Sequence, residues 1–298
     1  MKVLITGSTG LIGSALVPYL AACGHEVVRL LRTDVPQGDA SWYPERNKID
    51  LPRDINIDAV IHLAGANIAE KRWTNRRKAL IRDSRVDGTR LLVQALTELN
   101  PIPKTLLSAS AIGIYGDRGD DVVDEDSELS NGFLPDICKE WEMETHPAKH
   151  VGIRVVNLRT GLVLSQNGGM LGRMLPPFHF GFGATIGSGT QYMSWIAIDD
   201  IICAINHILT HDTLVGPVNL VAPNPVDNHK FTKTLGMVLH RPAIFRVPSF
   251  CVKVLFGEMG DMLLLSSTRV HPSKLVASEF QFRYPQLEDA LCHSLITS

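Results

Sequence analysis

Short apolar runs alternate with amphipathic segments through the first half of the chain. The apolar runs are residues 3–5, 27–31, 59–63, 105–108 and 153–158. Nearly continuous apolar runs of this length are typical of strands that are covered on both faces, as in a parallel sheet. Between the runs, apolar residues recur at helical spacing in residues 13–23, 74–99 and 134–145. This alternation predicts an α/β fold with a doubly wound parallel sheet.

The pattern changes after residue 165. Residues 168–189 contain seven glycines and the pair Pro176–Pro177, which predicts a loop-rich segment over a substrate cleft. A strand-like run at 218–221 is expected to return to the sheet. Proline-punctuated helices are expected at 228–239 and 250–265. We therefore expect a small C-terminal lobe on the substrate side of the sheet.

A glycine-rich turn, T-G-S-T-G-L-I-G at residues 6–13, stands between the first apolar run and the first amphipathic segment. Strand, glycine turn and helix together form the Rossmann-type geometry that binds a dinucleotide pyrophosphate. Gly7 permits the tight turn, Gly10 lets the backbone approach the phosphates, and Gly13 lets the helix pack close to the strand. An ordinary tight turn is the alternative, and the flanking strand and helix disfavour it.

The end of the second predicted strand distinguishes NAD from NADP. An acidic residue there would bind the adenosine ribose hydroxyls, but the chain has Leu31 at that position and Arg32 after it. The planar guanidinium of arginine suits a 2′-phosphate, so NADP(H) is the predicted cofactor. A solvated surface arginine is the alternative role for Arg32. We expect an NADP-binding Rossmann domain of residues 1–166 and 190–223, with residues 167–189 and 224–298 forming the substrate-capping segment and the lobe.

Composition and charge exclude several classes of function. The net charge is −2, and 29 basic and 31 acidic residues are mixed along the chain, so neither nucleic acid nor a membrane surface is an expected partner. The apolar stretches are short and the first predicted strand begins at residue 2, from which we expect a cytoplasmic protein. The five cysteines lack a C-x-x-C pair and favour a reducing compartment. No Cys or His spacing predicts a metal site.

Several motifs resemble those of one superfamily. They include D-A-V-I-H-L-A-G at 58–65, R-V-D-G-T at 85–89, S-A-S-A-I-G-I-Y-G at 108–116 and W-I-A-I-D-D at 195–200. With the glycine turn, these look like the extended short-chain dehydrogenase/reductase superfamily. The segments at 133–142, 176–189 and 269–275 are similar to its atypical, sugar-epimerase-like YfcH branch. The resemblance covers essentially the whole chain.

The resemblance implies a set of cofactor contacts. Leu63, Ala64 and Gly65 would lie along the cofactor, where small residues let the backbone approach closely. Arg85 stands where superfamily members usually have asparagine near the nicotinamide ribose; a helix-surface arginine paired with a neighbouring acid is the alternative. The remaining expected contacts are Thr9, Leu11, Ile12, Ser108 and Val163.

The usual catalytic pair of the superfamily is missing. Typical members use Y-x-x-x-K on the helix after the fourth strand, and alignment on Trp141–Glu142 puts Leu134 and Cys138 at those positions. Leucine has no proton to transfer, and a thiol has neither the charge nor the reach of an ammonium group. Ser108 and Ser110 stand where the superfamily has its hydroxyl helper, and Ser110 is the preferred candidate. Tyr115 and Asp117 are candidate proton relays, with packing of the tyrosine ring as the alternative role of Tyr115.

Three functions are compatible with the sequence. The leading one is an NADP(H)-dependent oxidoreductase that acts on an unidentified small carbonyl or hydroxyl compound. The second is a non-catalytic NADP(H)-binding sensor or scaffold, motivated by Leu134 and Cys138. The third is a nucleotide-sugar epimerase, which is weakest because epimerisation needs a tyrosine-type base. The expected partners are a small-molecule substrate and a second copy of the chain in a homodimer.

Overall fold

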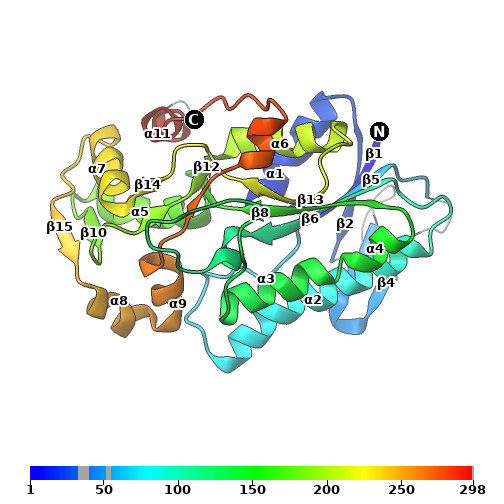
Figure 1. Ribbon diagram of the computed structural model, residues 1–298, viewed down its shortest axis with the longest axis horizontal. Helices are drawn as coiled ribbons and strands as arrows, with labels where there is room; N and C mark the ends of the chain where they lie inside the picture. Colours follow the sequence, from blue (N-terminus) through cyan, green and yellow to red (C-terminus); the bar gives the residue numbers. More distant parts are fainter. Residues whose placement is uncertain (33–39, 52–54, 297–298) are drawn as a thin grey trace.

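The computed structural model describes residues 1–32, 40–51 and 55–296, which form an α/β fold around a large central sheet (Figure 1). Its strands are β1 Lys2–Thr6, β2 Glu26–Leu31, β3 Ala40–Tyr43, β4 Lys48–Asp50, β5 Ala59–His62, β6 Thr105–Ala111, β8 Arg154–Thr160 and β13 Gly216–Leu220. In the described part of the chain the sheet order is β13-β8-β6-β5-β1-β2-β3-β4, and only β3 and β4 pair antiparallel. The predicted Rossmann-type doubly wound sheet is confirmed.

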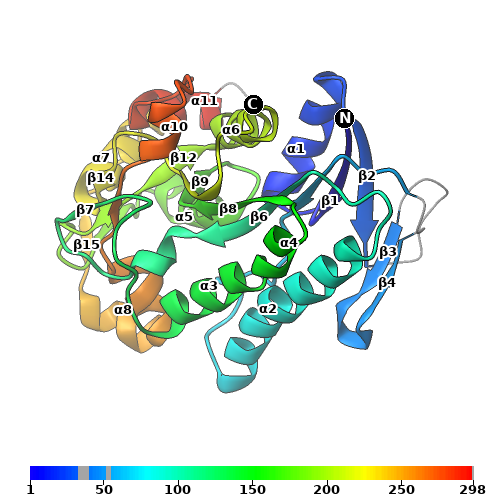
Figure 2. The same cartoon turned by 45° about the vertical axis from the view of Figure 1, so that its right-hand side comes forward.

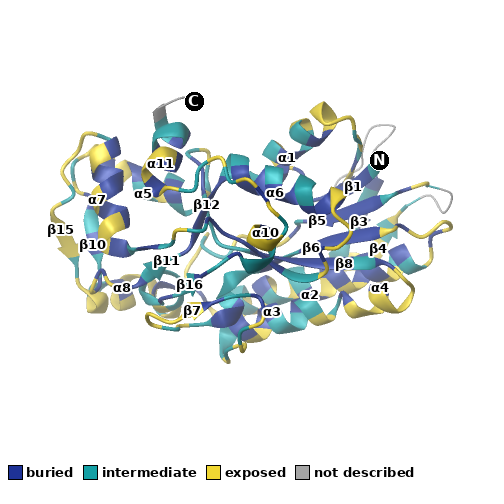
Figure 3. Ribbon diagram, turned by 45° about the horizontal axis from the view of Figure 1, so that its top comes forward, coloured by how far each residue is buried: buried dark blue, intermediate teal, exposed yellow. Residues whose placement is uncertain are grey.

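Helices cover both faces of this sheet (Figures 1 and 2). On one face lie α1 Leu11–Ala22 and α6 Ile198–Thr210, and on the other lie α2 Asn75–Thr97, α3 Phe133–Met143 and α4 His146–His150. Successive side chains of β1 point to opposite faces, so Val3 and Ile5 join the core under α1 and α6 while Leu4 joins the core under α2. The central strands β1, β5, β6 and β8 are therefore buried on both sides (Figure 3).

A separate hydrophobic core organises the lobe beyond the sheet. It lies between α5 Gly169–His179, α7 Asn228–Val238 and α11 Leu287–Ile296. The lobe's other helical segments are α8 Ser249–Phe256, α9 Glu258–Gly260 and a π-helical turn Asp261–Leu265, whereas α10 Ser273–Ala277 packs against β13 of the central sheet. In the described ranges, four two-stranded sheets stand apart from the central sheet: β10 Ala184–Ile186 with β15 Phe245–Val247, β11 Tyr192–Met193 with β14 Val226–Asp227, β12 Trp195–Ala197 with β9 Leu162–Leu164, and β16 Arg269–Val270 with β7 Val122–Val123.

The structure corrects the sequence prediction at two places. The loop-rich segment expected at 168–189 contains helix α5, because Leu171, Leu175 and Phe178 recur at helical spacing and are buried in the lobe core. Glycine and proline content obscured that period. Strands β3 and β4 were missed because each is only a few residues long. Within the described ranges, no helix is both long enough and apolar enough to cross a bilayer.

Candidate cofactor and substrate site

The glycine turn connects β1 to α1 beside the end of β5, where the strand order reverses. Gly7 has a φ of +71°, and a Cβ there would lie 2.7 Å from the carbonyl carbon of Leu63. A Cβ at Gly13 would lie 2.2 Å from the carbonyl oxygen of Gly7. Both contacts are too close for a side chain, so the turn needs glycine at both positions. Ligands bind at such switch points in doubly wound folds.

The start of α1 offers groups that suit a pyrophosphate. Gly10 is the N-cap, within the described residues no side chain caps the helix, and no acid stands in its first turn. The hydroxyl of Ser8 is buried and has no hydrogen-bond partner among the described residues. Unpaired N–H groups, the helix dipole and this hydroxyl all favour an anion. Thr9 is exposed on the same turn, whereas Ile12 packs against the sheet core.

A buried polar chain fixes the end of β5 against β1. The backbone N–H of Ala64 donates to Thr6 Oγ1 at 3.2 Å, and Thr6 Oγ1 lies 2.7 Å from His62 Nδ1. His62 Nε2 lies 3.0 Å from Thr89 Oγ1, which also accepts from the indole of Trp141 at 2.8 Å. Burial, with a smaller contribution from the charge of Arg32, lowers the pKa of His62 to about 4. A neutral histidine therefore links β1 and β5 to α2 and α3.

The end of β2 places its arginine at the surface next to the glycine turn. Leu30 pairs with Thr6 in the sheet, so Leu31 and Arg32 follow beside the turn. Leu31 is half-buried and Arg32 is exposed, with its Cζ atom 5.9 Å from the ring centroid of Trp42. This is the location that the predicted contact with a 2′-phosphate requires.

A cavity of ≈ 770 Å³ lies beside the glycine turn, between the sheet end and the lobe. Of the predicted site residues, Leu11, Arg85, Ser110 and Val163 line it. Leu63 packs against the core near Val163, Ala64 is buried, and a Cβ at Gly65 would lie 3.4 Å from Arg85 Cζ. The structure therefore brings these predicted residues together.

Arg85 lies at the cavity and forms no ion pair with any of the residues that the structure describes. Its Nη1 donates to the carbonyl oxygen of Ile81 at 2.9 Å, and its Cζ lies 5.1 Å from the ring centroid of Trp141. The neighbouring acids Asp83 and Asp87 pair with other arginines of α2. The alternative role that the sequence allowed for Arg85 is thus wrong.

Ser110 donates a hydrogen bond to a carboxylate that is clamped by an arginine. Its Oγ donates to Glu142 Oε1 at 2.6 Å. Arg159 donates to both oxygens of Glu142, each at 2.9 Å. The side chains of Glu142 and Arg159 are only 12% and 4% exposed. In the sequence, Glu142 served only to align the helix with the superfamily pattern. Residues 134, 138 and 142 share one face of α3, and this spacing is the signal that indicates the location of Glu142 at the site.

The structure does not support a relay role for Tyr115. The side chain is fully buried and does not line the cavity. Its hydroxyl donates to Asn219 Oδ1 at 2.8 Å and accepts from Arg159 at 2.9 Å. Burial raises the pKa of this tyrosine. Tyr115 therefore belongs to the hydrogen-bond network behind Glu142.

The cofactor contact expected of Ser108 is also not supported. Ser108 is fully buried within β6, does not line the cavity, and has no hydrogen-bond partner for its hydroxyl among the described residues. Leu134 and Cys138, in contrast, both line the cavity, as the helix alignment predicts. Burial raises the pKa of the Cys138 thiol to about 12, so it stays protonated at neutral pH. Neither side chain replaces the missing Tyr and Lys.

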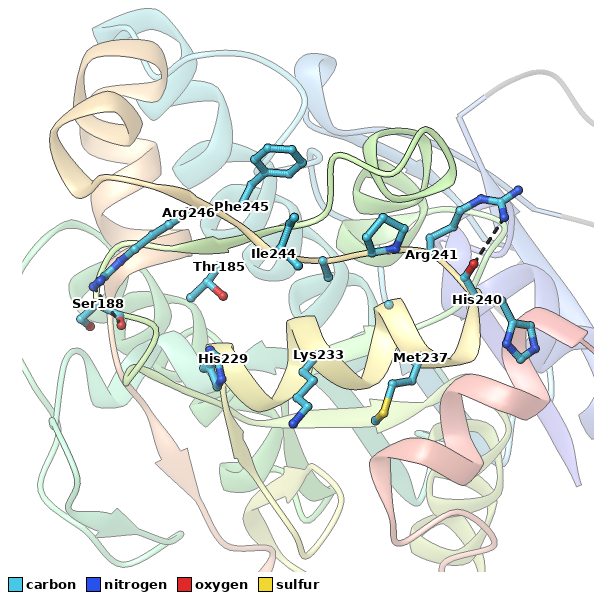
Figure 4. A pocket seen from close by; sticks show the side chains of 13 residues that line it. Thr185, Ser188, His229, Lys233, Met237, His240, Arg241, Ile244, Phe245 and Arg246 are labelled. Carbon is cyan, nitrogen blue, oxygen red and sulfur yellow. Dashed lines mark hydrogen bonds between the residues drawn. The ribbon is translucent and has the colours of Figure 1, made fainter.

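A second hollow lies in the lobe between α7 and β15 (Figure 4). Several basic side chains line it, among them Lys233, Arg241 and Arg246. Their charged ends point in different directions, and both arginines already donate to backbone carbonyls. None of the predicted site residues lines this hollow. The cavity beside the glycine turn, which four predicted site residues line, is therefore the candidate site.

Known proteins resemble the chain over nearly its full length. Residues 3–221 match the model of the NAD dependent epimerase/dehydratase family, and residues 247–294 match a domain of unknown function, DUF1731. Epimerase family protein Mb2239 of Mycobacterium bovis is 43% identical over 290 residues, which are 97% of this chain and 96% of that protein. Epimerase family protein YfhF of Bacillus subtilis is 37% identical, covering 98% of this chain and 97% of that protein.

A solved structure shows the same similarity. The crystal structure of human epimerase family protein SDR39U1 (isoform 2) with NADPH is 33% identical, has a TM-score of 0.89, and overlaps 98% of each chain. The glycine turn at the switch point of the sheet and the match of residues 3–221 to the family model point to the same family. The chain belongs to the NAD dependent epimerase/dehydratase family, an NAD(P)-binding family of the extended short-chain dehydrogenase/reductase type.

Proposed function

We propose that the protein binds NADP(H) in preference to NAD(H) and is an oxidoreductase for a small carbonyl or hydroxyl compound. Arg32 is exposed at the end of β2, and Leu31 offers no acceptor to ribose hydroxyls. The related human protein was solved with NADPH, which supports the same cofactor. The turn from Gly7 to Gly13 would hold the pyrophosphate, and Arg32 the 2′-phosphate. The cofactor supplies or accepts a hydride at its nicotinamide ring.

The Ser110–Glu142 hydrogen bond carries the catalytic part of the proposal. Ser110 lines the cavity, so its hydroxyl can contact a substrate oxygen. A proton released by the substrate can pass from Ser110 to the Glu142 carboxylate, because the two side chains share a hydrogen bond of 2.6 Å. Arg159 holds that carboxylate in place through two hydrogen bonds. Together these side chains would do the proton-transfer work of the missing tyrosine.

Calorimetric titration of the two cofactors tests the cofactor preference. Arg32→Ala should weaken NADPH binding by about tenfold or more, because a hydrogen bond between charged groups contributes about 1.5–3 kcal/mol, and should leave NADH binding nearly unchanged. Arg46→Ala is the matched control, since Arg46 also lies over an aromatic ring, with its Cζ 5.7 Å from the Tyr43 centroid. Equal losses for both cofactors in Arg32→Ala would show that Arg32 is structural.

Turnover of NADPH with a panel of aldehydes and ketones tests the catalytic part. We expect activity in the natural chain and a loss of kcat of about 10²-fold in Ser110→Ala, with NADPH affinity retained. Glu142→Gln should shift the pH profile of the remaining activity, because the carboxyl group that exchanges a proton with the substrate through Ser110 is lost. Non-catalytic NADP(H) binding is the second candidate function, favoured by Leu134 and Cys138 at the cavity. Normal NADPH binding with no turnover of any panel member would establish that candidate instead.

A further inference from the structure

We infer that the substrate is an uncharged, largely apolar carbonyl or hydroxyl compound, and not a nucleotide sugar. This inference rests on the oxidoreductase function proposed above and concerns the part of the cavity that faces the lobe. That part is lined mainly by thioether and aliphatic side chains from α5, β11 and the π-helical turn: Met170, Met174, Met193, Met262, Leu264 and Leu265. Methionine is flexible and polarizable, so such a surface adapts to apolar ligands of different shape.

The cavity lacks the free cations that a diphosphate requires. Among the described residues, its lining includes two cationic side chains, Arg85 and Arg173, and two acids, Asp117 and Asp261. Arg85 already donates to the carbonyl oxygen of Ile81, and Arg173 to that of Ala69. A diphosphate is bound by several charge-assisted hydrogen bonds, and here the acidic side chains balance the basic ones. A nucleoside diphosphate would therefore lose its hydration with little compensation.

Three polar side chains on the lobe side already bond to the protein itself. Gln191 Nε2 donates to the carbonyl oxygens of Ile186 and Leu264, at 2.9 and 3.0 Å. Asn228 Oδ1 accepts from the backbone N–H of Ile186 at 2.8 Å. Ser194 Oγ donates to the carbonyl oxygen of Thr268 at 2.8 Å.

These bonds hold the apolar turn in place, and among the described residues they leave the hydroxyls of Tyr192 and Ser266 as the lobe-side groups that a ligand can reach. Sugar hydroxyls would enter a surface that has few groups to pair with them, which is costly. At the sheet end, the Ser110 hydroxyl remains to contact one oxygen of the substrate. The arrangement fits a molecule with a single reactive oxygen and an apolar body.

Binding of the neutral naphthyl ketone prodan, whose emission shifts to shorter wavelength in apolar surroundings, tests the inference in the full chain saturated with NADP⁺. We expect a blue-shifted bound state. Leu264→Asp and Met174→Asp, on two different elements, should each weaken prodan binding about tenfold or more while NADP⁺ affinity is retained. Leu80→Asp is the control, because Leu80 is 49% exposed on α2, and it should bind prodan like the natural chain. UDP-glucose should not displace the probe.

A turnover series gives a second readout. With NADPH and straight-chain aldehydes, kcat/KM should rise about fourfold for each added methylene, the ratio that corresponds to burying one such group. No blue shift, unchanged binding in both aspartate variants, displacement by UDP-glucose, or faster turnover of sugar aldehydes would each overturn the inference. Any of these four outcomes leaves the proposed function intact as long as the chain still binds and oxidises NADPH. Failure to bind NADPH at all would instead overturn the proposed function itself.

Discussion

Replacement of Arg159 by methionine tests whether the buried carboxylate network stabilises the fold at the site. The Arg159 side chain is 4% exposed and donates to both oxygens of Glu142 and to the hydroxyl of Tyr115. Methionine keeps the apolar stem but leaves a nearly buried carboxylate without its cation. Removal of one partner from a buried ion pair costs about 3–5 kcal/mol of unfolding free energy.

Thermal unfolding followed by tryptophan fluorescence measures this cost. Proteins gain about 2.1 cal/mol/K of entropy per residue on unfolding, so for 298 residues the melting temperature should fall by about 5–8 °C. Arg90→Met is the matched control, because Arg90 pairs with Glu144 at 2.6 Å but is 45% exposed. Screening by water limits that pair to about 1 kcal/mol or less. Equal losses in the two variants would refute the reasoning that burial gives the Arg159–Glu142 pair its weight.

Two further predictions concern the site. The double variant Leu134→Tyr with Cys138→Lys restores the usual catalytic pair on one face of α3. Its melting temperature should fall without cofactor, because the lysine enters an apolar environment, and should recover when NADPH is added. A loss that persists with NADPH would show that these two positions serve the core. Burial lowers the pKa of His62 to about 4 in the folded chain, so His62 binds a proton more readily in the unfolded chain. Its contribution to the unfolding free energy, about 3 kcal/mol, is therefore complete above pH 6.5 and is lost as the pH falls to 4. Unfolding free energies of His62→Gln and the natural chain, measured in urea between pH 7 and 4, should therefore converge on the acid side, and parallel curves would contradict this.

The parts of the fold that the sequence predicts correctly are those set by local pattern. Strand β1, the glycine turn and α1 follow one another within the first 22 residues, so a continuous apolar run and glycine spacing suffice to identify them. Helix α3 could be placed well enough to put positions 134 and 138 at the cavity. Helix α5 was hidden because its glycines and prolines suggest a loop, and only burial in the lobe core makes its helical period decisive.

The candidate site was less predictable because its side chains find partners far along the chain. Tyr115 bonds Asn219 and Arg159, residues 104 and 44 positions away, and nothing in the local sequence indicates these contacts. The same limit applies to the Ser110–Glu142 bond. The carboxylate of Asp200 likewise finds its partners far along the chain, because it accepts hydrogen bonds from the backbone N–H groups of Arg283 and Tyr284.

The network behind Ser110 does not end within the sheet. Asn219, on the outermost parallel strand, also donates to the carbonyl oxygen of His271, in the chain segment between β16 and α10. Its backbone N–H donates to Glu125, which accepts from the backbone N–H of Lys274 as well. The C-terminal segment thus completes the hydrogen bonding of the network that lies behind Ser110. A shortened chain that kept every cofactor contact but lost this segment would leave Asn219 and Glu125 without these partners, so the support behind the site depends on residues far from the cofactor.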